Sequence, residues 1–113
     1  MATKSSLWAL ISSRNIYRTN AKKQLSIFDQ LQKIEDDDPQ LPSKLQLFSE
    51  SMLHYQRKID VLDLDILDSI EDEAKLQIEF TEISEFMESV VTSMKYAEKK
   101  LAELKQVYGH RPW

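Results

Sequence analysis

The sequence predicts an all-α fold, an elongated antiparallel three-helix bundle with coiled-coil-like heptad packing. Apolar residues recur at intervals of three and four along most of the 113 residues, which is the helical period. One glycine and three prolines leave two long stretches without the residues that most often break a helix. There is no cysteine, so packing must supply the stability. We expect a single helical domain over residues 1–108 and a tail over 109–113.

The first helix is predicted over about residues 5–35. Its apolar stripe consists of Leu7, Leu10, Ile11, Tyr17, Ala21, Leu25, Phe28 and Leu31. The run Asp36-Asp37-Asp38-Pro39 should end it, because carboxylates oppose the dipole at a helix C-terminus and proline disfavours helical geometry at the residue before it.

The second helix is predicted over about residues 43–67, with Ser43 as its cap after Pro42. Its seam steps regularly by three and four through Leu45, Phe48, Met52, Tyr55, Ile59, Leu62 and Ile66. We place a chain reversal at 67–69, because Ser69 followed by Asp72 is a variant of the capping box.

The third helix is predicted over about residues 70–108 and carries the longest seam. The seam consists of Leu76, Phe80, Ile83, Met87, Val90, Met94, Ala97, Leu101, Leu104 and Tyr108, and Gly109 should end the helix. No glycine or proline lies between Ser43 and Tyr108, so one continuous helix that forms an intermolecular coiled coil is the alternative.

Charge is unevenly distributed along the chain. Residues 1–28 hold five basic residues and no acid, although the whole chain has a net charge of −4. One stripe is a candidate site for an anionic membrane or nucleic acid: Arg14, Arg18, Lys22 and Lys23. The competing interpretation pairs these bases internally with the acids of the second helix, which are Asp60, Asp63, Asp65 and Asp68.

The sequence does not predict an enzyme. A single glycine excludes the usual phosphate loops, and His54 and His110 are too isolated to form a metal pair. Glu79, Glu82, Glu85 and Glu88 lack the Glu-x-x-His partners of di-iron bundles. We therefore expect no catalytic residues, cofactor, metal or small-molecule substrate. The apolar run at Leu7–Ile11 is too short for a signal peptide or a transmembrane segment, so a cytoplasmic or nuclear location is expected.

Several apolar residues fall outside the predicted seams. In a monomeric bundle these residues would expose apolar surface to water, so they are candidates for contact with a second copy or with another helical protein. They are Ile16, Leu53, Val61, Leu64, Ile78 and Val91.

Residues 14–105 resemble the helical N-terminal segment of the Gag-like polyproteins of BEL/Pao-type retrotransposons. The similarity rests on the basic run RTNAKKQLSIF at 18–28, a polar spacer, and a third helix that opens around Glu79-Phe80. Between them lies a second helix with Leu45, Phe48, Met52, Tyr55 and Ile59. Spectrin-type repeats and syntaxin-like bundles share the length and period, but the first helix lacks the central Trp usual in spectrin-type repeats.

The resemblance implies a Gag-derived assembly module that associates with itself or with other proteins. The chain has no zinc knuckle and no Asp-Ser/Thr-Gly protease motif, so packaging of nucleic acid and proteolysis are not implied. We therefore expect a noncatalytic helical scaffold or interaction module.

Overall fold

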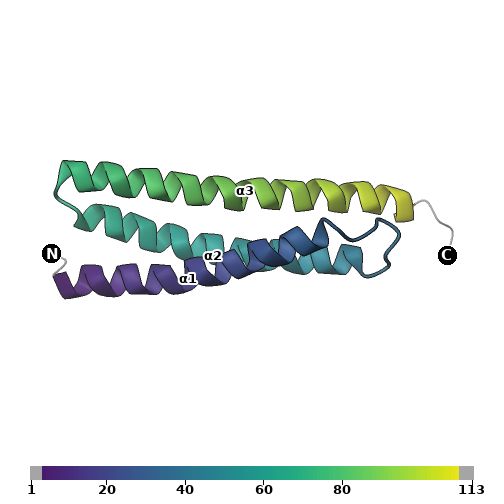
Figure 1. The fold of residues 1–113 in the computed structure, drawn as a ribbon, viewed down its shortest axis with the longest axis horizontal. Helices are drawn as coiled ribbons and strands as arrows, with labels where there is room; N and C mark the ends of the chain where they lie inside the picture. The colour runs from purple at the N-terminus through teal and green to yellow at the C-terminus, as the bar shows by residue number, and fades with distance from the viewer. Residues whose placement is uncertain (1–3, 110–113) are drawn as a thin grey trace.

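Three helices fold back on one another along a common axis. The computed structural model describes the backbone of residues 4–109 and the side chains of residues 7–105. Helix α1 spans Lys4–Leu31, α2 spans Leu41–Ser69 and α3 spans Glu73–Gly109. They run up, down and up, which gives a body of 61 × 21 × 20 Å (Figure 1). The predicted elongated three-helix bundle is confirmed; of the predicted tail, Gly109 ends α3 and the rest lies outside the described residues.

Helix α1 ends at Leu31, four residues before the predicted boundary. Leu31 is the last buried residue of its apolar stripe, and Gln32 and Lys33 after it are exposed. The chain tightens there, since the Lys33 and Ile34 amides donate to carbonyls three residues back. From this tighter turn the half-buried side chain of Ile34 packs against the core.

Helix α2 begins at Leu41, two residues before the predicted start. Pro42 lies in its first turn, where the amide that proline lacks would have no partner within the helix. The prediction that Ser43 caps this helix is wrong, because Ser43 already lies inside it. The Asp38 carboxylate instead accepts a hydrogen bond of 2.8 Å from the Gln40 amide just before α2.

The reversal between α2 and α3 lies at residues 70–72 rather than at 67–69, and it excludes the continuous helix. Ile70 is extended, with φ −95° and ψ 120°. The Ser69 hydroxyl donates to the Asp65 carbonyl, 2.8 Å away, so Ser69 belongs to the last turn of α2. The Asp72 carboxylate accepts from the Lys75 amide at 3.0 Å, which makes Asp72 the residue that caps α3.

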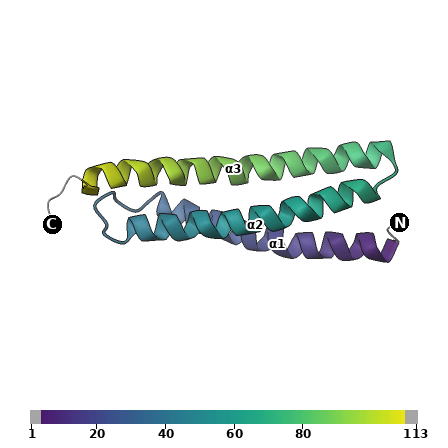
Figure 2. The same ribbon diagram turned by 180° about the vertical axis from the view of Figure 1, so that it is seen from behind.

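The core follows the predicted seams most closely in the half of the bundle that holds the α1–α2 connection. Phe28 of α1 stacks on Phe48 of α2 with ring centroids 5.0 Å apart, and Tyr96 of α3 meets Phe28 edge-on at 5.4 Å. Helix α2 packs against both neighbours, whereas α1 and α3 touch much less. Viewed from behind, α1 and α2 cross in projection while α3 runs alongside (Figure 2).

The first half of α3 packs more loosely than its seam predicts. Phe80 is 57% exposed, so its predicted place in the core is wrong. Leu76, Ile83 and Met87 are half-buried, and fully buried seam residues begin only at Val90. The side chain of Tyr108, the last predicted seam residue, lies outside the described ones. Charged side chains from all three helices lie in the interior at this level.

Candidate functional site

An ionic layer, defined as Arg14, Asp63 and Glu79, joins the three helices inside the loose half of the bundle. Arg14 is 3% exposed and Asp63 is 4% exposed. One guanidinium nitrogen of Arg14 donates to the Asp63 carboxylate at 3.1 Å and also to the Glu79 carboxylate. Each of the three residues comes from a different helix, so one cation couples all of them.

Arg18 lies beside the ionic layer, one helical turn after Arg14. Its guanidinium approaches the Asp63 carboxylate at 3.8 Å and lies over the ring of Phe86, 5.3 Å from the ring centre. Burial lowers the pKa of Arg18, and the charge of Arg14 lowers it further. Arg18 therefore adds a second inward-facing cation to the same level of the bundle.

The ionic layer is only partly satisfied. Among the described residues, the second oxygen of Asp63 and the Nε atoms of Arg14 and Arg18 are buried and have no hydrogen-bond partner. Burial raises the pKa of the Asp63 carboxyl and outweighs the hydrogen bond from Arg14 and the charges of Arg14 and Arg18. Asp60 is exposed, but partial desolvation by neighbouring groups also raises its pKa. The cost of removing these charges from water offsets much of their attraction, so the ionic layer is weak evidence for stability.

The structure divides the predicted basic stripe into two parts. Arg14 and Arg18 turn inward to the acids, and only Lys22 and Lys23 are exposed. The competing interpretation, internal charge pairing, is confirmed at Asp63, while Asp60, Asp65 and Asp68 remain exposed. Spacing could have revealed this, since Arg14 continues the steps of three and four from Leu10 to Tyr17 and Ala21.

The predicted apolar contact residues lie largely at the surface. Leu53 is exposed and Val91 is half-buried. The other four are between 60% and 64% exposed; we call them the apolar belt, and they are Ile16, Val61, Leu64 and Ile78. Five further large apolar side chains are exposed and were not predicted to be contact residues; they are Trp8, Ile27, Leu47, Phe80 and Tyr96. Of these, Phe80 was predicted to lie in the seam of the third helix.

A groove lies between α1 and α3, which contact each other less than either contacts α2. Its volume is 490 Å³. From α1 it is lined by Leu25, Phe28 and Asp29, and from α3 by Glu85, Glu88, Ser89, Thr92 and Ser93. Periodicity could not predict this groove, because it indicates which face of a helix is buried but not how far apart two helices lie.

The described residues contain no group of three metal-ligating side chains close enough to hold a metal ion. His54 is exposed and meets the neighbouring Tyr55 ring edge-on, and His110 lies outside the described residues. Within residues 4–109, no helix is both long and apolar enough to cross a membrane.

Fold and site together define a three-helix bundle with ionic side chains inside and apolar side chains outside at one level. Comparison with models of protein families, with curated proteins and with solved structures finds no match to this chain.

Proposed function

We propose that this protein is a noncatalytic helical scaffold that associates laterally with copies of itself or with another helical protein. The observation that carries the proposal is the position of the apolar belt relative to the ionic layer. Ile16 follows Arg14 by two residues, Val61 and Leu64 flank Asp63, and Ile78 precedes Glu79. Two residues along a helix correspond to about 3 Å, so belt and layer lie at one level.

At this level the usual distribution of polarity is reversed. The ion pairs Arg14–Asp63 and Arg14–Glu79 occupy the interior, where a bundle normally places aliphatic side chains. The belt residues come from all three helices and are more than half exposed. Covering them with neighbouring helices would gain about 25 cal/mol for each Å² of apolar surface removed from water. This supports a role in assembly.

The resemblance to Gag-like segments points in the same direction and belongs to the proposal. An assembly module needs contacts on more than one side, since a chain with a single self-complementary face stops at a dimer. Belt residues on three different helices offer contacts in several directions around the long axis.

Light scattering across a concentration series tests the proposal. We expect a mass that rises above the 13.3 kDa of one chain as concentration increases. The variant Val61→Glu/Ile78→Glu should shift the mass to one chain while circular dichroism stays unchanged. The control Ser43→Glu/Ser84→Glu places the same charges at exposed polar sites that are not one helical turn from a belt residue, and it should leave association intact. A wild-type mass of one chain at every concentration would refute self-association.

Binding to an anionic membrane or to nucleic acid is the alternative, and the exposure of Lys22 and Lys23 is the observation that favours it. Salt-sensitive binding to anionic vesicles or to RNA, lost in Lys22→Glu/Lys23→Glu, would support that function. The net charge of −4 and a pI near 5.2 oppose it.

A further inference from the structure

The groove between α1 and α3 is open to solvent and lies between two contacts that join these helices. At one end the Arg18 guanidinium of α1 lies 5.3 Å from the Phe86 ring of α3. At the other end Phe28 and Tyr96 meet edge-on at 5.4 Å. The lining of α3 runs from Glu85 to Ser93, which is about 12 Å of helix. Because the groove is open, about two turns of a longer helix can lie along it.

The floor of the groove is less polar than its composition suggests. Leu25 and Phe28 contribute its apolar side chains from α1. The hydroxyl of Ser89 donates to the Phe86 carbonyl at 2.9 Å, and that of Ser93 donates to the Val90 carbonyl at 2.8 Å. Because these hydroxyls are bonded within their own helix, they place no demand for a polar partner on an occupant.

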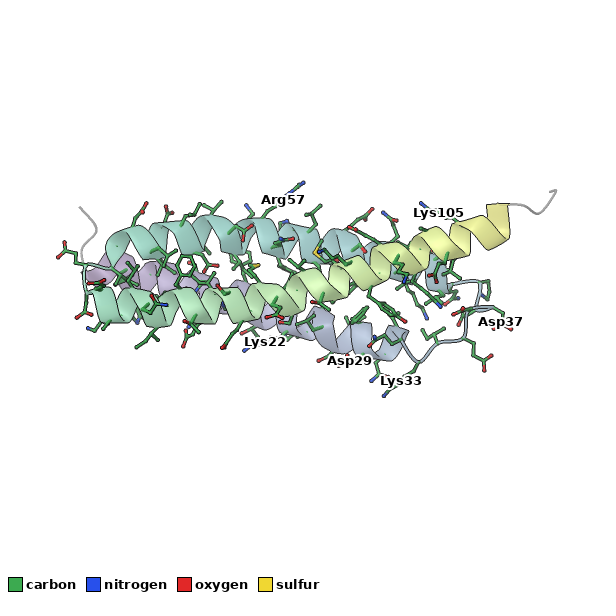
Figure 3. All side chains as sticks on the ribbon, turned by 90° about the horizontal axis from the view of Figure 1, so that it is seen from above. Lys22, Asp29, Lys33, Asp37, Arg57 and Lys105 are labelled. Atoms are coloured by element: carbon green, nitrogen blue, oxygen red, sulfur yellow. The ribbon has the colours of Figure 1, made fainter. Side chains whose placement is uncertain are left out.

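The rim of the groove is acidic. Asp29 borders it on α1, and Glu85 and Glu88 border it on α3. These three side chains make no ion pair or hydrogen bond with the rest of the described chain. The α3 wall is therefore negative. Lys22 lies on the same edge of α1 as Asp29, outside the lining of the groove (Figure 3).

We propose that the groove between α1 and α3 binds a basic amphipathic helix of a partner protein. The partner places apolar side chains at intervals of three and four on Leu25, Phe28 and the small residues of α3. Its Lys or Arg side chains face the Glu85 and Glu88 wall. Repulsion from Lys22 orients the partner, so that its basic flank lies against α3 rather than α1.

This inference rests on the proposed function, in which the protein associates with copies of itself or with another helical protein. It names the class of that other helical protein. It uses a different surface from the apolar belt, so the two can fail separately. The variant Val61→Glu/Ile78→Glu changes the belt alone and should bind a partner helix with unchanged affinity.

The test uses a labelled synthetic peptide of about 18 residues, long enough for five helical turns. It carries Leu at intervals of three and four and Lys on the flanking positions, and binding to the full chain is followed by fluorescence anisotropy. Glu85→Lys/Glu88→Lys should weaken binding about tenfold or more, as expected for losing two charge contacts and gaining repulsion. Lys22→Glu should strengthen binding severalfold, a gain that a damaged fold cannot produce.

Matched controls separate groove binding from general attraction to an acidic protein. Glu98→Lys/Glu103→Lys makes the same charge change at exposed sites on α3 outside the groove and should have little effect. Ser89→Tyr fills the groove without touching its charges and should abolish binding, whereas Thr81→Tyr, exposed elsewhere on α3, should not.

Equal weakening by both charge variants, or binding that survives Ser89→Tyr, would overturn the inference. It would also be overturned if Glu85→Lys/Glu88→Lys lowered the mass of the protein without peptide, since the occupant would then be a second copy. A wild-type mass above one chain with no peptide binding would leave the proposed scaffold standing and remove the groove site.

Discussion

The Arg14 guanidinium lies 3.1 Å from the Asp63 carboxylate, which is 49 residues further along the chain. The same nitrogen of Arg14 also bonds Glu79, so a single side chain links α1 to both other helices. The charge balance of the interior therefore depends on Arg14.

Replacing Arg14 alone should destabilise the fold strongly. Arg14→Met leaves Asp63 buried with only the more distant Arg18 for compensation, and we expect a loss of about 3–5 kcal/mol in the free energy of unfolding. Replacing the whole ionic layer, as in Arg14→Met/Asp63→Leu/Glu79→Leu, should restore at least the wild-type stability. Urea unfolding followed by circular dichroism measures both. A triple variant as unstable as the single one would show that the layer contributes net stability.

The stability contributed by Asp63 should fall as pH rises. Burial raises its pKa above the ordinary value of 3.8, so above pH 3.8 the folded state holds a proton that the unfolded state has released. Wild type should therefore lose stability relative to Asp63→Asn, which does not titrate, as pH increases through the window from 3.8 to the raised pKa. Urea unfolding at a series of pH values measures the difference. A wild type that gains on the variant with rising pH would mean that the ion pairs with Arg14 and Arg18 outweigh burial.

The cap of α3 should be worth measurable stability. Asp72→Ala removes the acceptor for the Lys75 amide and the negative charge before the first turn, at a cost of about 1 kcal/mol. Glu71→Ala, one residue earlier and exposed, should be close to neutral. Thermal unfolding compares the two, and equal effects would contradict the assignment of Asp72 as the cap.

Two phenylalanines of the predicted seams should differ sharply on truncation. Phe48 is fully buried and stacks on Phe28, so Phe48→Ala should cost about 3–5 kcal/mol. Phe80 is 57% exposed, and Phe80→Ala should change stability by about 0.5 kcal/mol or less. Urea unfolding of both variants tests the burial pattern, and a large loss at position 80 would place that ring inside the core.

Periodicity was sufficient to predict three helices, their order and most of the core. Leu45, Phe48, Met52, Ile59 and Ile66 are all buried as their spacing predicts. Helix ends were less predictable, because they depend on single hydrogen bonds, such as that of Asp72, and on where burial stops, as at Leu31. A pattern of apolar residues contains neither kind of information.

The site was harder to predict than the fold. A basic residue on a helix is expected to face water, so Arg14 and Arg18 were predicted to belong to the stripe that binds an anionic partner. In the structure both face inward, where Arg14 pairs with Asp63 and Glu79 and Arg18 pairs with Asp63. Phe80 was assigned to the core because an aromatic residue in a regular apolar seam is expected to be buried, although its ring is 57% exposed. Local spacing places Arg14 on the apolar stripe of α1, but it cannot identify the acids 49 and 65 residues away that pair with it.

The described chain enters the bundle at one end of its long axis and leaves it at the other, as the positions of Lys4 and Gly109 show (Figure 1). Tension applied through these two ends is therefore directed along the helices and slides α1 against α2 and α2 against α3. Interfaces loaded in shear must give way over their whole length at once, whereas a hairpin pulled from adjacent ends unzips turn by turn. The Arg14 bond to Asp63 lies across the α1–α2 interface and its bond to Glu79 joins α1 to α3, so both bonds resist the sliding of α1 along the bundle.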